Sequence, residues 1–133
     1  MASAAKHILI VDDEEAVRYV FERYLSIVGY RVSSAADGAE ALRVHAADHA
    51  DLVVTDYRMP GMNGAELMAR LRAIDASLPG IVISANPYDV GPLLDGVAFF
   101  QKPVSFERVL AHMDGVFSAA CAGRTSTPAA ANR

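Results

Sequence analysis

Short, continuous apolar runs alternate along the chain with longer segments in which apolar residues recur at helical spacing. The runs are rich in β-branched residues and predict buried strands at residues 7–11, 51–55, 81–83 and 98–101. A more polar stretch at 31–35 suits a strand at the edge of a sheet. Strands that alternate with helices at this pitch form βαβ units, so the pattern predicts a parallel sheet covered by helices on both faces.

Four segments carry the helical pattern. The expected helices are residues 14–28, residues 38–48, a segment around Leu67–Ile74, and a final amphipathic helix from Phe106 to Phe117. Gly29 suits the position just after the first helix, because glycine adopts the left-handed conformation that ends helices. The residues from Ser118 onward show no periodicity. We therefore expect one folded domain at 1–117 and a disordered tail at 118–133.

The interval between the fourth and fifth strands is poor in helix-forming residues. It contains Pro87, Gly91, Pro92 and Gly96, and the residue before a proline avoids helical geometry. The fourth helix of the pattern should therefore be short or irregular. At most, Pro92 could start a turn that carries the next two leucines, residues 93 and 94, inward.

Composition narrows the class of protein. A chain of 133 residues with 53% hydrophobic and 21% charged residues fits one globular domain. The net charge of −4 argues against a nucleic-acid binder, and no apolar run approaches the ~18–20 residues of a membrane span. The single cysteine, Cys121, excludes an internal disulfide, and no signal peptide is evident, so we expect a cytoplasmic protein.

Polar residues with related chemistry end four of the predicted strands. They are Asp12 and Asp13, Asp56, Ser84, and Lys102, which precedes Pro103. The carboxyl ends of parallel strands share one edge, and open α/β sheets bind ligands there. Each of these residues alone would more often be a helix cap or a solvated side chain. Their occurrence at four successive strand ends is what predicts a site.

The residue types in this site favour magnesium and phosphate. Three neighbouring carboxylates repel one another unless a cation intervenes, and hard oxygen ligands favour Mg²⁺. A carboxylate such as Asp56 can also attack phosphorus and become an acyl phosphate. Lys102 and the Ser84 hydroxyl could then contact the phosphoryl oxygens.

The blocks ILIVDDEE, VVTDYRMPGMNG, IVISA and FFQKP resemble those of the receiver domain of two-component response regulators. The likeness covers residues 7–117 and points to a stand-alone, chemotaxis-regulator-like receiver. It implies a flavodoxin-like doubly wound α/β fold with five parallel strands in the order 2-1-3-4-5. Chemotaxis receivers are themselves the usual example of that strand order, so the order follows from the resemblance rather than from periodicity.

The resemblance also implies roles for individual residues. Asp56 would be the phospho-acceptor, assisted by Lys102 and Ser84, with Mg²⁺ held by Asp12, Asp13, Asp56 and the backbone carbonyl of Arg58. Ser84 and Phe99 would be the switch residues, and the Lys102–Pro103 peptide would be cis. The phosphoryl group would come from a histidine kinase or a histidine phosphotransfer protein. A downstream protein would bind the face of the last strand and the final helix, and the chain would be a monomer or a weak dimer.

Other interpretations remain open. One is an aspartyl-phosphate phosphatase, although that class expects an Asp-x-Asp pair after the first strand, where this chain has Asp12-Asp13-Glu14. Another is a receiver excised from a hybrid kinase, and a third is a receiver that binds partners without being phosphorylated. His45 and His49, four residues apart, could in principle hold a metal, but a solvated helix face is the better interpretation.

Overall fold

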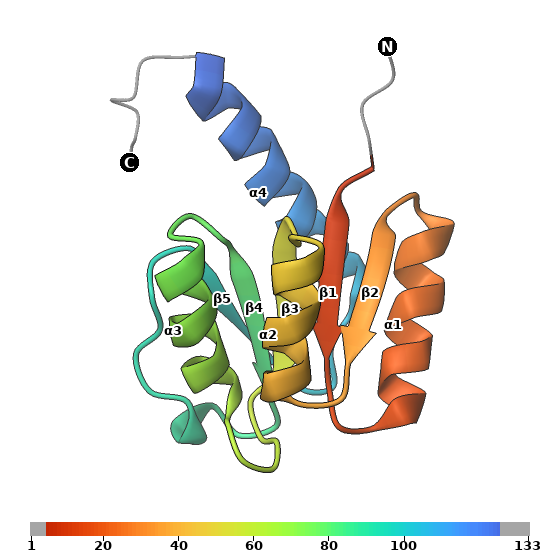
Figure 1. Ribbon diagram of the computed structural model, residues 1–133. Helices are drawn as coiled ribbons and strands as arrows, with labels where there is room; N and C mark the ends of the chain where they lie inside the picture. Colours follow the sequence, from red (N-terminus) through yellow and green to blue (C-terminus); the bar gives the residue numbers. More distant parts are fainter. Residues whose placement is uncertain (1–4, 126–133) are drawn as a thin grey trace. The chain divides into compact units, whose positions relative to one another are not determined.

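The computed structural model describes residues 5–125, with side chains through residue 119. Its five strands form one parallel sheet in the order β2-β1-β3-β4-β5, which confirms the predicted topology (Figure 1). The strands are β1 (His7–Val11), β2 (Arg31–Ala35), β3 (Leu52–Asp56), β4 (Gly80–Ser84) and β5 (Val97–Gln101). The helices are α1 (Glu15–Ile27), α2 (Gly38–Ala47), α3 (Gly64–Ile74) and α4 (Phe106–Thr125), with a short 3₁₀ turn η1 (Pro87–Asp89).

The central strands β1, β3 and β4 are buried along their whole length. This explains why their sequences are continuous apolar runs rather than alternating ones. The two outer strands are more exposed, as the polar sequence of β2 predicted for an edge. Figure 1 shows α2 and α3 side by side over one face of the sheet.

A cluster of buried apolar residues lies between that face and the two helices. Its members are Leu9, Val11, Ala35, Ala41, Ala50, Val53, Leu67, Met68, Leu71, Leu78 and Val82. Ala50 and Leu78 lie in the connections before β3 and β4. The other members come from alternate positions of the strands and from positions three or four apart on the helices, as the two periodicities require.

Local signals fix where the helices begin and end. The Asp37 side chain accepts a hydrogen bond from the Glu40 amide, 2.8 Å away, and so caps the start of α2. Asn63 and Glu66 form a reciprocal capping box at the start of α3. Gly29, with φ of 107°, follows the C-cap of α1 as predicted.

The connection from β4 to β5 contains only the single turn η1, which confirms that the fourth helix of the pattern is short and irregular. Of the two leucines expected to point inward, Leu93 packs against the core cluster. Leu94 is 44% exposed, so that part of the prediction is wrong. The described connection is too irregular to bury both neighbours on one side.

The chain divides into two compact units at the Lys102–Pro103 bond. The first holds the sheet and the first three helices, and the second holds α4. This last helix continues to Thr125, so the prediction that structure ends at residue 117 is wrong. Its alanine-rich extension lacks an amphipathic pattern but contains good helix formers. Residues 126–133 of the predicted tail lie outside the described residues.

Candidate functional site

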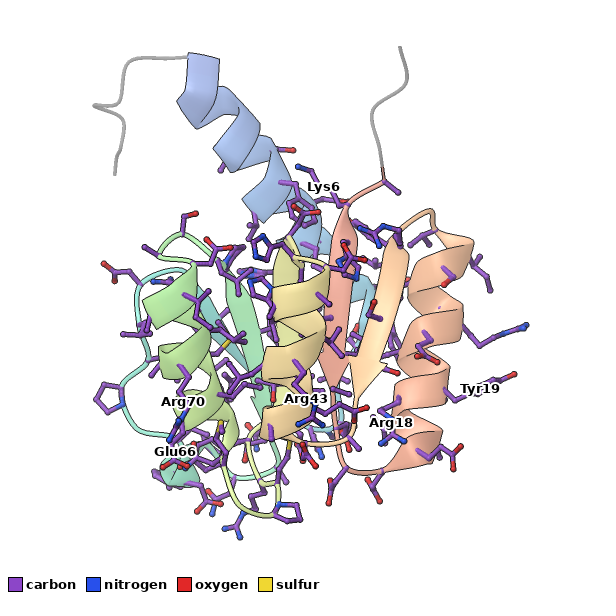
Figure 2. All side chains as sticks on the ribbon, in the orientation of Figure 1. Lys6, Arg18, Tyr19, Arg43, Glu66 and Arg70 are labelled. Atoms are coloured by element: carbon purple, nitrogen blue, oxygen red, sulfur yellow. The ribbon has the colours of Figure 1, made fainter. Side chains whose placement is uncertain are left out.

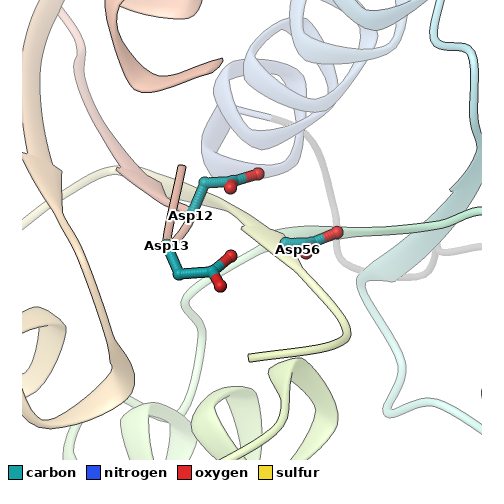
Figure 3. A group of neighbouring side chains, drawn as sticks. All are labelled: Asp12, Asp13 and Asp56. Carbon is teal, nitrogen blue, oxygen red and sulfur yellow. The ribbon is translucent and has the colours of Figure 1, made fainter. Parts of the chain in front are cut away.

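Three carboxylates gather at the carboxyl edge of the sheet. Asp12 and Asp13 follow β1, and Asp56 ends β3. The parallel register pairs Val11 with Thr55, which brings the two strand ends together. One oxygen from each carboxylate lies within 4.8 Å of the others (Figure 3). Asp12 and Asp56 are buried, whereas Asp13 is exposed.

Asp12 is held in a fixed position within this crowded cluster. Its Oδ1 accepts a hydrogen bond of 2.9 Å from the Glu14 amide. Burial raises the pKa of Asp12, and the charges of Asp56 and Asp13 raise it further, although the Glu14 amide and the nearby Lys102 ammonium oppose this. The cluster is therefore a concentration of negative charge that a cation would relieve.

Lys102 supplies a positive charge from just beyond the last strand. Its Nζ lies 3.0 Å from Oδ1 of Asp56. Burial by itself lowers the pKa of this ammonium, but the hydrogen bond and charge of Asp56, with the charges of Asp12 and Glu14, raise it overall. The Lys102 amide also donates to the Ser84 carbonyl at 2.9 Å, which ties the ends of β4 and β5 together.

Ser84 is the buried last residue of β4. The register pairs its neighbour Ile83 with Asp56, so the serine follows directly beside the phospho-acceptor candidate. Its hydroxyl accepts from the Asn86 amide at 3.2 Å and donates to the Asn86 carbonyl at 3.3 Å. These are long hydrogen bonds, so the hydroxyl can exchange them for a better acceptor. Phe99, partly buried, lies on β5 opposite Val82.

The loop after Asp56 is kept close to the strand end by a glycine. A Cβ added to Gly64 would lie 2.5 Å from the Asp56 carbonyl oxygen, too close for any other residue without a shift of the backbone. The Gly64 amide donates to the Tyr57 carbonyl at 2.8 Å. The Thr55 hydroxyl donates to the Asp56 carbonyl at 2.9 Å. The backbone of Asp56 is thereby fixed from both sides.

Arg58 joins this loop to the turn η1. Its guanidinium makes an ion pair with Asp89, in which Nε lies 2.9 Å from Oδ2 and Nη2 also contacts that oxygen. The pair borders a surface hollow of about 570 Å³ lined by Tyr57, Arg58, Met59, Pro60, Asn63 and Asp89. No sequence pattern signals this pairing, because the two residues are 31 positions apart and belong to irregular segments.

The donor set fits a hard divalent cation. All three side chains offer carboxylate oxygens, the ligands that Mg²⁺ prefers, and they lie at one edge with a lysine beside them. An anion that carries its own negative charge, such as a phosphoryl group, would be compatible with the cluster only when cations balance it.

The structure thus brings together Asp12, Asp13, Asp56 and Lys102, and it sets Ser84 at the adjoining strand end. The backbone carbonyl of Arg58 as a ligand, the switch role of Phe99 and the cis Lys102–Pro103 bond stay predictions.

The two histidines singled out in the sequence, His45 and His49, are not part of this cluster. The prediction that they lie on a solvated helix face is wrong for His45. His45 is fully buried, whereas His49 is exposed. Their rings stack with centroids 4.8 Å apart. The Nδ1 of His45 accepts from the Ala50 amide, so in the neutral ring the hydrogen is on Nε2, and neither nitrogen offers a free lone pair to a metal.

Comparisons with known proteins point in the same direction as the geometry. Residues 8–114 match the family model described as response regulator receiver domain. The chain is 36% identical over 112 residues to the C4-dicarboxylate transport transcriptional regulatory protein DctD of Rhizobium meliloti, a match that covers 81% of this chain and 24% of that protein. It is 40% identical over 111 residues to the response regulator MprA of Mycolicibacterium vanbaalenii, covering 80% of this chain and 48% of that one. The chain therefore spans about half or less of the length of these relatives.

A solved structure extends the comparison to the fold. The response regulator TrrA of Thermotoga maritima, in complex with Mg²⁺-BeF, superposes with a TM-score of 0.75 at 28% identity, and the match covers 84% of this chain and 98% of that one. Within residues 5–125, no helix combines the length and apolar composition needed to cross a bilayer.

Proposed function

The chain belongs to the response regulator receiver domain family, and on that basis we propose that Asp56 accepts a phosphoryl group from a phosphohistidine. One observation carries the proposal. The carboxylate of Asp56 lies next to those of Asp12 and Asp13, and the Lys102 ammonium is 3.0 Å from its Oδ1. As a receiver, the chain is a signalling protein rather than an enzyme acting on separate substrates.

The acidic cluster is the site for Mg²⁺. Asp12, Asp13 and Asp56 would hold the ion, with the Arg58 carbonyl as a further predicted ligand. The similar TrrA was solved with Mg²⁺-BeF, which supports the same cofactor here. When bound, Mg²⁺ would offset negative charge on the phosphoryl oxygens.

The residues of the chain itself account for the rest of the transfer. A carboxylate oxygen of Asp56 attacks phosphorus, the N–P bond of the donor histidine breaks, and its electron pair returns to the imidazole nitrogen. Lys102 contacts a phosphoryl oxygen as a point charge. The Ser84 hydroxyl leaves its long hydrogen bonds with Asn86 and donates to another phosphoryl oxygen. Phosphotransfer of this kind depends mainly on alignment and balanced charge.

Receiver domains interact with histidine kinases, and the donor for this chain would be such a kinase or a histidine phosphotransfer protein. A downstream protein would respond to phosphorylation through residues of β5 and of α4, with Ser84 and Phe99 as the switch residues. The chain would act as a monomer or weak dimer. The chain spans about half or less of the length of the curated relatives described above, so the output of those longer proteins is not assigned to it.

Incubation with acetyl phosphate and Mg²⁺, followed by intact-mass measurement, tests the proposal. The wild-type chain should gain one labile phosphoryl group, and Asp56→Asn should gain none, because an amide is a poor nucleophile. Lys102→Ala should label at least about tenfold more slowly, since its charge aligns the phosphoryl group. Glu107→Gln, which makes the same carboxylate-to-amide change at an exposed position of α4, serves as the matched control and should label normally.

Two results would point elsewhere. A wild-type chain that stays unlabelled while folded would indicate a receiver that only binds partners. Labelling of Asp56→Asn at the wild-type rate would place the acceptor on another residue.

A further inference from the structure

The start of β5 is fixed without a helix. Crossovers between parallel strands usually contain an α-helix that packs on the sheet, whereas here the chain passes from β4 through η1 and runs beside α3 before it enters β5 (Figure 1). Within the described sheet, β5 pairs only with β4. Its first four residues, Val97–Phe100, are all apolar and all partly exposed. A strand with no strongly preferred face specifies its register weakly.

One side chain of α3 contacts the chain just before both strands. The Nε of Arg72 donates to the Leu78 carbonyl at 2.6 Å, and its Nη2 donates to the Asp95 carbonyl. Leu78 lies two residues before β4, and Asp95 lies two residues before β5. The planar guanidinium can make both hydrogen bonds at once, and so it sets the start of β5 against the start of β4.

Gly96 completes this arrangement. Its φ of 86° lies in the left-handed region, and a Cβ there would be 2.8 Å from the Nη2 of Arg72. The Gly96 carbonyl accepts from the Gly80 amide at 3.1 Å, and the Val97 amide donates to the Leu94 carbonyl at 3.0 Å. The turn into β5 therefore favours glycine because of its positive φ, and a Cβ at this position would displace the Arg72 guanidinium.

The register that results reaches the functional site. It runs from the pair Gly80–Val97 to the pair Ser84–Gln101, and Lys102 follows at once. A slip of one residue would move Lys102 by roughly 3.3 Å along the strand and turn its side chain to the other face of the sheet. The ammonium would then lose its 3.0 Å contact with Asp56.

We propose that Arg72, together with Gly96, is a positioning residue for phosphotransfer, because it sets the register of β5 that places Lys102 against Asp56. The proposal rests on the function proposed above for Asp56 and Lys102. It assigns to α3 a task that a crossover helix would otherwise perform.

Labelling rates with acetyl phosphate test the proposal in a double-mutant cycle. Arg72→Ala and Gly96→Ala should each slow labelling by about tenfold or more, because small misplacements of an aligning group are costly. Arg72→Lys, which cannot bridge two carbonyls with a planar group, should be intermediate. Arg70→Ala, an exposed arginine of the same helix (Figure 2), is the matched control and should label normally.

The second arm repeats Arg72→Ala in a Lys102→Ala background. If Arg72 acts through Lys102, its removal should now change the rate by less than about twofold, since coupled residues are not additive. The affinity for Mg²⁺ should not fall in any of these variants, because the three carboxylates lie at the ends of β1 and β3, and loss or displacement of the neighbouring ammonium can only favour a cation. An equal slowing in both backgrounds, or a matching loss of Mg²⁺ affinity, would overturn the proposal in favour of a general structural role.

A measurement of the β4–β5 register that does not need phosphorylation tests the positioning role of Arg72 separately from the proposed phosphotransfer to Asp56. Nuclear Overhauser contacts between β4 and β5, and amide exchange at Lys102, report whether its amide still bonds to the Ser84 carbonyl. Altered contacts and faster exchange in Arg72→Ala support the positioning role even if the wild-type chain is never labelled. Unchanged contacts and exchange would overturn it even if the labelling experiment succeeds.

Discussion

At the scale of single residues, His45 shows how a buried polar group can escape a sequence pattern. It shares a buried stripe with Gly38 and Ala41, at a spacing of three or four residues on α2. The four-residue spacing between His45 and His49 suggested a solvated helix face. The same four-residue spacing between Ala41 and His45 was the signal that His45 is buried. Its Nε2 has no hydrogen-bond partner among the described residues and lies 3.7 Å from Oδ2 of Asp75.

This environment makes stability depend on pH. Burial lowers the pKa of His45, and the nearby His49 and His7 lower it further, although Asp75 opposes them. Between this lowered pKa and the ordinary value of about 6.5, the unfolded chain binds more protons than the folded one. The contribution of His45 to stability should therefore be complete above about pH 6.5 and should be lost as the pH falls.

Urea unfolding of wild-type and His45→Gln chains between about pH 5 and 8 measures this effect. The wild type should lose stability toward the acid end more steeply than the variant, because glutamine does not titrate. The difference between the two curves separates His45 from His7 and His49, which both chains retain. Parallel curves would show that His45 has the same pKa in the folded and unfolded chains, which would contradict the effect of burial.

Unlike the burial of His45, the residues of the site could be predicted from the sequence. Asp12, Asp56 and Lys102 lie at the ends of strands that stand out in the sequence as continuous apolar runs, and a parallel sheet aligns strand ends at one edge. The contacts that Arg58 and Arg72 make were not predictable, because their partners are 31 and 23 positions away in irregular segments. No local periodicity encodes such contacts.

At the scale of elements, the connection between β4 and β5 replaces a helix by a few anchored side chains. Prolines and glycines predicted the loss of the helix, but they could not predict which residues pack. Val90, Leu93 and Val97 lie against the core cluster, while Leu94 is 44% exposed. The segment is thus an extended strap held at several points rather than an amphipathic helix.

Two neighbouring substitutions test this description. Leu93→Ala should lower the free energy of unfolding by roughly 1–2 kcal/mol, less than for a fully buried leucine, because its side chain is only partly buried. Leu94→Ala should change it by no more than about 0.5 kcal/mol. Chemical denaturation of both variants gives the comparison. Equal losses would mean that the connection does not pack as described.

At the scale of the whole molecule, stability and function compete at the carboxyl edge of the sheet. The fold brings Asp12, Asp13 and Asp56 within 4.8 Å of one another, and burial of Asp12 makes that crowding more unfavourable. The rest of the sheet must hold the cluster together against this repulsion. A cation that binds only the folded chain offsets the repulsion, so metal binding and folding are linked.

Thermal melts with and without Mg²⁺ measure this link. At a hundredfold excess of Mg²⁺ over its Kd, binding should add about 2.7 kcal/mol to the free energy of unfolding. Asp13→Asn should melt at a higher temperature than the wild type in the absence of metal, because one repelling charge is gone. It should gain less from Mg²⁺, since a ligand is gone as well, whereas Glu107→Gln should gain as much from Mg²⁺ as the wild type does. A cluster whose carboxylates repel one another and also bind metal explains why one substitution raises the melting temperature without Mg²⁺ and reduces the gain with it.

Two outcomes would contradict this description. Coincident melts of the wild type with and without Mg²⁺ would refute the metal site. A metal-free Asp13→Asn that melts at a lower temperature than the wild type would refute the repulsion.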